Sequence, residues 1–572
     1  MTRFQDLNDQ DKKQIRRWVM SFIRPEAGHL LMVMLMAAIM TLFALAQPYF
    51  TKLLIDEGLI AGNLNRVITF AGLIVLMAVV VFVLGGINRW LYVALSGRIL
   101  FRLREDVYAH LLRLAPDFFA RWRRGDILNR LDGDVAEVQR FATDSLLAVV
   151  NGLLALLGSL LVMLYLSWKL TLVVFVLLPV QVWFLKRLRP RVERQTREVR
   201  EKSSDIVSYL MESLMGVKLI QTMSVEEAER RRLHQLNSGY LDRLLKLQIL
   251  NHVTSGVPGL LTTVATAAVF VAGAYLLIQG EATVGTLVAF SAYMARATGP
   301  VQTFLGLYVG WQRMMVSLKR VREVRAEPVK VRDPEAPEHL GETALGELRL
   351  EGVSFTHPGR DGQGVKDINL GIRRGEKVLI TGPSGAGKTT LMDLLCRHYV
   401  PDQGAIYLDG VDLRRLKADE IRQLIGLVSQ DVQLFRGTIA DNIRFGRRDA
   451  SLEQVKAAAR LARLDTFIDE LPDGYDTLVG EKGAMLSGGQ QQRLALARTL
   501  LRQPRVVILD EATSAIDRDT EADLLRAIEG AMPGVTLIVI SHRPLAAFCP
   551  DRTYIMERGG LREKRVAEDG HG

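Results

Sequence analysis

A glycine-rich segment in the second half of the chain has residue types and spacing suited to holding phosphate groups. In KVLITGPSGAGKTTLMDLL the pattern G-x-x-x-x-G-K-[ST] lies between an apolar strand and an apolar helix. The glycines of this pattern let backbone N–H groups converge on phosphates at a helix N-terminus. We expect Lys388 to reach the terminal phosphates of a nucleotide and the Thr389 hydroxyl to bind Mg²⁺. The predicted loop consists of Gly382, Pro383, Ser384, Gly385, Ala386, Gly387, Lys388, Thr389 and Thr390.

A pair of acidic residues follows a second apolar segment, RVVILDEATSAID. The pattern predicts a buried strand over 506–509 that ends in Asp510, where P-loop ATPases hold Mg²⁺ with a carboxylate. Glu511 follows at the edge where open parallel sheets bind ligands, and we expect it to polarise the attacking water. The alternative is a solvated charge pair at a strand end, which the phosphate loop upstream disfavours. Together the two segments predict an ATP hydrolase.

A second turn suited to an anion lies between these segments, in MLSGGQQQRLALAR over 485–498. A serine and two glycines precede an apolar run that is typical of a helix. Such a turn allows the backbone to approach an anion closely. The chain therefore contains two anion-binding turns, and the purpose of the second is not evident from the nucleotide loop alone.

The elements that position these segments divide the chain into two parts. With 572 residues it exceeds what one hydrophobic core supports. It is 49% hydrophobic and 24% charged, with a mean hydropathy of +0.14, and its apolar residues are concentrated before residue 313. We predict a membrane all-α six-helix domain with long cytoplasmic helical extensions, followed by an α/β P-loop ATPase domain. The predicted boundaries are 1–28 for a cytoplasmic N-terminal lead-in, 29–323 for the six-span transmembrane domain, 324–346 for a linker and 347–572 for the nucleotide-binding domain.

Six apolar segments approach the length of about 20 residues that a membrane helix needs. The fourth is short and the sixth contains Arg296; the six are 30–50, 67–88, 145–168, 170–185, 253–280 and 282–312. Lysine and arginine are absent from 279–285 but dense in 97–134 and 186–248. The positive-inside rule then places both termini and the two long loops in the cytoplasm. We expect a multi-pass protein of the cell (inner) membrane.

The two long loops, 89–144 and 186–252, have helical composition. Helices that run out and back over such a loop would reach about 40 Å beyond the bilayer. Two independent cytoplasmic subdomains are the alternative, but neither loop holds a core of its own. The net charge of +10 is concentrated in these loops, which favours a membrane surface over nucleic acid. Two distant cysteines, Cys396 and Cys549, favour a reduced compartment.

These segments together resemble the ATP-binding cassette family, specifically its exporter-type half-transporters, over nearly all of the chain. Leu486-Ser487-Gly488-Gly489-Gln490 matches the family's signature motif. The resemblance implies that Gln430 in GLVSQDVQLF touches Mg²⁺ and the membrane domain. It also implies that Asp517 in SAID belongs to the D-loop and that His542 in VISHR contacts the γ-phosphate. In the family, segments similar to 477–483, 118–135 and 212–229 connect the cassette to the membrane domain, the last two through short coupling helices.

Some positions depart from the family's pattern. His357 in SFTHP aligns with the tyrosine that stacks on adenine, so the contact to the base is in question while nucleotide binding is not. Met223 occupies a position in the second loop that is usually Phe, whereas Pro300 is present where the family often has a proline. The C-terminus is short and lacks the familiar final helical segment.

The resemblance implies a dimer that binds ATP and Mg²⁺ and exports or flips an amphipathic or hydrophobic substrate across the membrane. Ser487 and Gly489 would then approach a γ-phosphate held by Lys388 of the partner subunit. Intact motifs favour a homodimer, and a heterodimer with a degenerate partner stays open. A lipid, a drug or a peptide are all admissible substrates. Arg296 is the candidate contact for an anionic head group, with a helix–helix contact as the alternative.

Other classes of function are weighed against export. A DNA-repair or cohesin-like ATPase shares the cassette motifs, but six apolar spans disfavour it and we expect no nucleic-acid partner. A leader-cleaving peptide exporter and an importer are disfavoured by the domain content. The alternative that stays open is a non-transporting membrane ATPase or ATP-gated channel.

Overall fold

The computed structural model describes residues 17–358, 363–480, 486–511, 518–541 and 548–564. It divides into two compact units. The first consists of Met1–Val107 and Asn129–Arg322, and the second of Tyr108–Leu128 and Glu323–Gly572.

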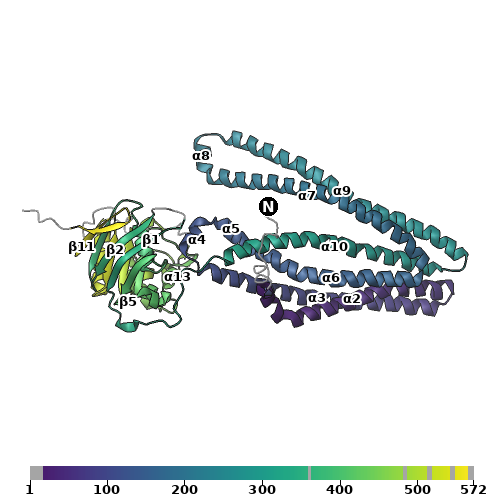
Figure 1. The fold of residues 1–572 in the computed structure, drawn as a ribbon, viewed down its shortest axis with the longest axis horizontal. Coiled ribbons are helices and arrows are strands. Elements are labelled where there is room, and N and C mark those ends of the chain that lie inside the picture. Colours follow the sequence, from purple (N-terminus) through teal and green to yellow (C-terminus); the bar gives the residue numbers. More distant parts are fainter. Residues whose placement is uncertain (1–16, 359–362, 481–485, 512–517, 542–547, 565–572) are drawn as a thin grey trace, which may run out of the picture. The chain divides into compact units, whose positions relative to one another are not determined.

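Long helices make up the first unit, and Figure 1 shows them running beside one another. They are α2 (Ala27–Leu53), α3 (Leu64–Leu111), α6 (Val135–Leu166), α7 (Trp168–Met215), α9 (Glu226–Ile278) and α10 (Val284–Arg325). The short elements are the 3₁₀-helix η2 (Arg24–Glu26), the π-helices η3 (Leu54–Ile60) and η4 (Arg130–Asp134), and α8 (Val217–Thr222). Helices α7 and α9 are continuous over 48 and 53 residues, so the second long loop is an extension of the spans, as expected, rather than a separate subdomain.

The junction between α6 and α7 follows from one polar residue. Ser167 adopts an extended backbone conformation that ends α6, and its hydroxyl accepts a hydrogen bond from the backbone N–H of Leu170. A serine that caps a helix in this way satisfies a backbone donor that has no partner within the helix. The chain therefore turns sharply between the third and fourth predicted spans.

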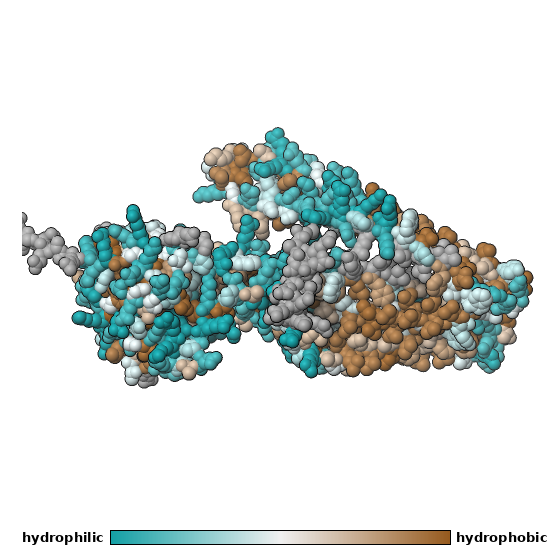
Figure 2. All heavy atoms as spheres, in the orientation of Figure 1, coloured by the Kyte–Doolittle hydropathy of each residue, from teal (hydrophilic) through white to brown (hydrophobic). Residues whose placement is uncertain are grey.

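Side chains from four helices form the core of the first unit. Val269 of α9 and Phe290 and Tyr293 of α10 are fully buried, and they pack in one cluster with Met163 of α6 and Leu170 of α7. Large apolar side chains also cover the outer faces, where Phe82, Val271 and Ile278 are 81%, 74% and 86% exposed. Figure 2 shows the resulting broad apolar area over the long helices. Lipid is the solvent that such a surface requires.

Four described helices are long and apolar enough to cross a membrane, namely Arg17–Ile60, Leu64–Leu111, Arg124–Leu166 and Glu226–Ile278. Helices α7 and α10 are not among these four, a count that covers only the described residues and leaves the predicted spans in both helices open. Both helices nevertheless contribute fully buried residues to the core of the helical bundle.

Two sheets form the second unit. The antiparallel sheet has the order β2-β1-β4-β5, and the other has the order β12-β11-β3-β10-β9-β6, parallel except at β12. A short pair, β7 (Gly437–Thr438) and β8 (Leu478–Val479), lies apart. The strands are β1 (Leu348–Thr356), β2 (Gly364–Ile372), β3 (Lys377–Thr381), β4 (Gln403–Leu408), β5 (Val411–Asp412), β6 (Ile425–Val428), β9 (Val506–Asp510), β10 (Thr536–Ile540), β11 (Arg552–Glu557) and β12 (Gly560–Glu563).

Helices cover these sheets and add a second core. They are α4 (Pro116–Arg121), α5 (Arg124–Asn129), α11 (Lys388–Leu395), α12 (Ala418–Leu424), α13 (Ile439–Arg444), α14 (Leu452–Leu461), α15 (Asp465–Asp469), α16 (Gly488–Leu500) and α17 (Arg518–Ala531), with the 3₁₀-helices η5 (Gly341–Thr343), η6 (Leu413–Arg415) and η7 (Gly474–Asp476). One core cluster joins both sheets to α11, and the other joins the α13–α17 helices to β9 and β10. All five residues of β9 are buried, as its apolar sequence predicts.

Residues 108–128 pack in the second unit although they belong to the first long loop predicted for the membrane domain. Phe118 of α4 is 1% exposed, and Ala115 lies in the core cluster that contains Tyr399. Lys330 Nζ donates to Asp117 Oδ2 at 2.8 Å. Residues 108–128 thus fall within the predicted membrane domain, 29–323, but apolar residues of this segment are buried in the second unit.

Candidate functional site

Four parallel strands bring the predicted nucleotide segments to one edge of the sheet. In the register, Ile540 of β10 is paired with Ile380 of β3 and with Asp510 of β9. Val428 of β6 is paired with Leu509 of β9. Because parallel strands end at the same edge, the loops after β3, β6, β9 and β10 all begin there, which is where open α/β sheets bind ligands.

The glycines of the phosphate loop are required by its backbone. Gly387 has φ +107° and caps the N-terminus of α11, and a Cβ there would lie 2.6 Å from the carbonyl oxygen of Gly364. A Cβ on Gly382 would lie 2.2 Å from the carbonyl oxygen of Met556. Gly385 has φ +79°, a conformation that side chains disfavour. The loop therefore turns tightly onto the N-terminus of α11, where anions bind.

Lys388 begins α11 and its side chain lies along the phosphate loop. Its Nζ donates to the carbonyl oxygens of Gly382 at 2.9 Å and Pro383 at 3.0 Å. The residue is 6% exposed. Burial lowers the pKa of Lys388, while the nearby charges of Glu511 and Asp510 oppose that shift. The ammonium is thus held beside the loop, where phosphate oxygens would replace the carbonyls as partners.

The acidic pair lies beside the phosphate loop, as predicted. Thr389 Oγ1 lies 3.4 Å from Asp510 Oδ2, and Asp510 is 7% exposed. Burial raises the pKa of Asp510, and the charge of Glu511 raises it further. A hydroxyl and a carboxylate are hard oxygen ligands of the kind Mg²⁺ takes alongside phosphates. The oxygen ligands and the negative charge of the two neighbouring carboxylates both fit that ion.

Glu511 is held in a conformation that side chains rarely adopt. Its φ is +50°, and its backbone N–H donates to the carbonyl oxygen of Ile540 at 3.1 Å. A non-glycine residue in the left-handed region is uncommon and clusters at functional sites. The sequence pattern predicts Glu511 at this edge, but it does not predict this backbone conformation.

The signature segment forms the start of α16. Ser487 caps the helix: its hydroxyl accepts from the backbone N–H of Gln490 at 3.3 Å, and Gln490 Oε1 accepts from the Ser487 N–H at 2.8 Å. Gln490, predicted as a nucleotide contact, therefore uses its side-chain oxygen in this capping box. Ser487 and Gly488 are exposed. The helix N-terminus is open to an anion that approaches from outside the unit.

His357 lies in an aromatic cluster that the sequence reasoning did not identify. Its Nε2 lies 3.0 Å from Thr390 Oγ1. The ring packs edge-to-face on Phe355 and Tyr399, which stack on each other with centroids 4.9 Å apart. Phe355 and His357 stand at alternate positions in the segment SFTH, and alternate residues of a strand lie on the same face. This spacing is the sequence signal that could have predicted the pair. The cluster fixes the imidazole, and its contact with a base stays a prediction.

The remaining predicted residues differ in what the structure says of them. Gln430 follows β6 and is exposed at the sheet edge. His542 and Asp517 lie outside the described residues, as do 481–483 of the segment before the signature. Arg296 donates to the carbonyl oxygen of Ala44 and, at 3.0 Å, to Gln47 Oε1. Both contacts join α10 to α2, so they are of the helix–helix kind that was the alternative to substrate binding by Arg296.

Comparison with known proteins identifies both halves of the chain. The family model for the ABC transporter transmembrane region matches residues 30–301, and the model for the ABC transporter matches residues 365–514. The chain belongs to the ATP-binding cassette (ABC) transporter family. The resemblance inferred from the motifs is confirmed, together with the predicted fold class.

Several relatives of this ABC transporter align over nearly its whole length. An ATP-dependent lipid A-core flippase of Chromobacterium violaceum is 33% identical over 94% of this chain and 92% of its own. A putative multidrug export ATP-binding/permease protein, YgaD, of Bacillus subtilis is 31% identical over 95% of each chain. The structure of a bacterial Atm1-family ABC exporter with ATP bound superposes with a TM-score of 0.76 at 26% identity, covering 94% of each chain.

These similarities establish the class of activity. The protein is an ABC exporter, a multi-pass membrane protein whose nucleotide-binding domain couples ATP hydrolysis to transport. The predictions of an ATP hydrolase, of a translocase and of nucleotide binding are confirmed at this level. The roles of individual site residues stay predictions.

Proposed function

We propose that two copies of this chain form a homodimer that flips or exports an amphipathic or hydrophobic substrate by alternating access. The observation that carries the proposal is the exposed signature turn. Ser487 and Gly488 open the 13-residue helix α16, whose first turn has no acidic residue. Such a helix end favours an anion, and a nucleotide held by Lys388 of the partner subunit would supply one.

A second surface supports a partner subunit. Helix α8 lies at the turn between α7 and α9 (Figure 1), and its Leu219 is 62% exposed. Met215 and Met223, which flank α8, are 88% and 62% exposed. This segment belongs to a predicted cytoplasmic loop, where lipid does not cover apolar side chains. Apolar surface of this kind is typical of a protein contact, and the cassette of a second subunit fits the family's coupling helices.

The proposed chemistry assigns one task to each residue of the nucleotide site. Lys388 and the backbone N–H groups of the phosphate loop bind the β- and γ-phosphates. Mg²⁺, held by Thr389, Asp510 and Gln430, would neutralise charge on the transferred phosphoryl group. Glu511 orients the attacking water, and His542 and Asp517 complete the site around the γ-phosphate. Positioning and electrostatic stabilisation provide most of the catalysis in such ATPases.

The proposed substrate class follows from the membrane unit and from its relatives. Related proteins are named for lipid A-core and for multidrug export, and both kinds of substrate combine apolar and polar parts. Arg296 is the candidate contact for an anionic head group, because an ionisable residue within a membrane helix is costly and often functional. We place both termini in the cytoplasm and the protein in the inner membrane, on the basis of the arginine- and lysine-rich loops.

The decisive experiment measures ATP-dependent accumulation of labelled amphiphiles and drugs in inverted vesicles. Export predicts uptake that requires ATP and disappears in Glu511→Gln, with ATPase activity in lipid discs stimulated by the same compounds. An ATP-gated channel would instead give conductance without accumulation against a gradient. ATPase activity without either signal would indicate a non-transporting membrane ATPase.

A further inference from the structure

A buried arginine lies directly after the phosphate-binding helix. Helix α11 starts at Lys388 and ends at Leu395, Cys396 caps it, and Arg397 follows with φ +51°. Arg397 is 3% exposed. Burying a guanidinium costs free energy unless strong partners replace water. The partners of Arg397 therefore indicate why the residue is there.

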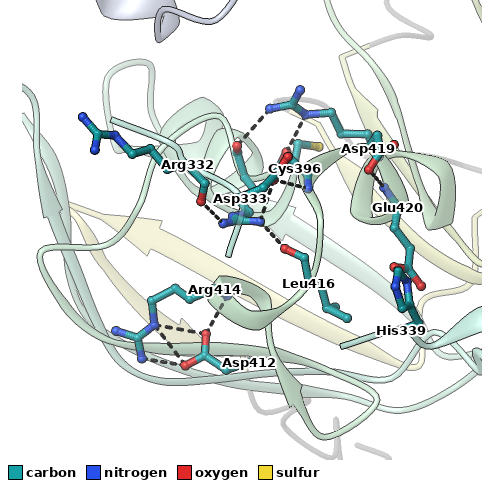
Figure 3. Close-up of polar contacts among 12 residues, drawn as sticks. Arg332, Asp333, His339, Cys396, Asp412, Arg414, Leu416, Asp419 and Glu420 are labelled. Atoms are coloured by element: carbon teal, nitrogen blue, oxygen red, sulfur yellow. Dashed lines mark hydrogen bonds and ion pairs between the residues drawn. The ribbon is translucent and has the colours of Figure 1, made fainter. Parts of the chain in front are cut away.

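Those partners belong to the linker and to the loop before α12 (Figure 3). Arg397 donates to the carbonyl oxygen of Arg332 at 2.8 Å and to that of Leu416, and its guanidinium lies 3.5 Å from Asp333 Oδ1. Its Nε is buried and has no hydrogen-bond partner among the described residues. One planar group thus holds two separate backbone segments, which an arginine fork can do and a lysine ammonium does less well.

The linker is fixed to the cassette at several further points. Asp333 Oδ1 accepts from the backbone N–H of Ala418 at 2.9 Å. The N–H of Glu338 donates to the carbonyl oxygen of Arg415 at 2.8 Å. Glu420 Oε1 accepts a hydrogen bond from the backbone N–H of Leu340 at 2.8 Å. Figure 3 shows the Glu420 side chain beside His339. Residues 332–340 are therefore a bound segment and not a free tether.

The C-terminal end of α11 is also held from α12. Arg422 donates to the carbonyl oxygens of Cys396 at 3.2 Å and Arg397 at 3.1 Å. These bonds satisfy carbonyl groups that the helix leaves without partners. Burial lowers the pKa of Arg397, while Asp333 opposes that shift and Arg422 adds to it. Arg397 and Arg422 therefore lie together at the C-terminal end of α11. Their hydrogen bonds connect this helix end to the linker and to α12.

Helix α11 connects the nucleotide to this junction. Its eight residues make a rod of about 12 Å, with the phosphate-binding lysine at one end and Arg397 at the other. The linker continues the chain directly from α10, the last long helix of the membrane unit. We propose that Arg397 is a positioning residue of the export cycle: it ties the phosphate-binding helix to the linker, so that nucleotide binding shifts residues 326–340. The inference rests on nucleotide binding at Lys388 and not on the proposed dimer or substrate.

Hydrogen exchange of backbone amides tests this inference on the full chain in lipid discs. MgATP is expected to slow exchange in peptides that cover the phosphate loop and to change exchange in peptides over 326–340. In Arg397→Met the phosphate-loop response is expected to persist while the linker response is lost. Arg397→Lys keeps the charge but not the fork, and its linker response is expected to be lost as well. Arg414→Met is the control, because Arg414 lies in η6, is exposed and pairs with Asp412 at 2.6 Å, with no hydrogen bond to the linker in the described part of the chain, and both responses are expected to remain.

Each other outcome overturns the inference. A linker that does not respond to MgATP in the wild-type protein shows that no movement is transmitted. A linker that responds in Arg397→Met as in the wild type shows that Arg397 is not the connection. Loss of both responses in Arg397→Met and Arg397→Lys shows that Arg397 supports the nucleotide site itself. None of these results depends on uptake of a substrate, so failure here is distinct from failure of the proposed function.

Discussion

Thr389 Oγ1 lies 3.4 Å from Asp510 Oδ2, although 121 residues separate the two in the chain. The contact joins the first turn of α11, the helix that follows β3 and the phosphate loop, to the end of β9, and β10 lies between β3 and β9 in the sheet. It places a hydroxyl and a buried carboxylate where both can bind one divalent cation beside the phosphates. Asp510→Asn removes one charge from this pair and is expected to lower ATPase activity by about 10²-fold or more. The measurement is turnover against Mg²⁺ concentration, with Thr389→Ser, which keeps the hydroxyl, as the control that retains activity.

Glu511→Gln is expected to bind ATP normally and to hydrolyse it at least about 10²-fold more slowly, because the amide cannot accept a proton from water. Nucleotide binding is measured with a fluorescent ATP analogue, and turnover by phosphate release. Near-normal turnover in this variant would refute the role of Glu511.

Ser487→Arg is expected to abolish turnover while each chain still binds nucleotide, because the bulky cation closes the exposed end of α16 but leaves the phosphate loop intact. A mixed dimer of Ser487→Arg and Lys388→Ala chains distinguishes shared sites from separate ones. If each site combines Lys388 of one chain with Ser487 of the other, one of the two sites is intact. Nucleotide trapped by vanadate should then return to about half the wild-type amount. No trapping in the mixed dimer would show that each site lies within a single chain.

His357→Ala is expected to raise the KM for ATP about tenfold with little change in kcat, since stacking on a base contributes about 1–3 kcal/mol. His357→Tyr restores a larger ring and should recover or improve the wild-type KM. If KM is unchanged in His357→Ala, then the aromatic cluster with Tyr399 is only part of the core.

Arg296→Ala is expected to lose the stimulation of ATPase activity by anionic amphiphiles while neutral drugs still stimulate. Gln47→Ala is the matched control, because it removes a partner of Arg296 in α2 but keeps the positive charge. Equal losses of thermal stability in both variants, with unchanged stimulation, would assign Arg296 to helix packing alone.

Much of the site could be predicted because its signals are local. The glycines of the phosphate loop must adopt positive φ and approach other backbone closely, and these demands act over a few residues, so they appear as a short pattern. The same holds for the Ser487–Gln490 capping box, which spans one helical turn. Long apolar runs predict membrane helices for a similar reason, although Arg296 weakens that signal in α10.

The sequence by itself determined the class of protein, the division into a membrane part and an ATPase part, and the identity of the phosphate loop and acidic pair. Only the tertiary structure decided which distant segments meet. The order β3-β10-β9-β6 brings Thr389 to Asp510, and Phe118 is buried in the unit that contains the cassette, to which residues 108–128 belong. Arg397 reaches the linker through backbone carbonyls, whose positions depend on the fold and not on residue type. Contacts of that kind leave no pattern in the sequence, because any residue can supply a carbonyl group.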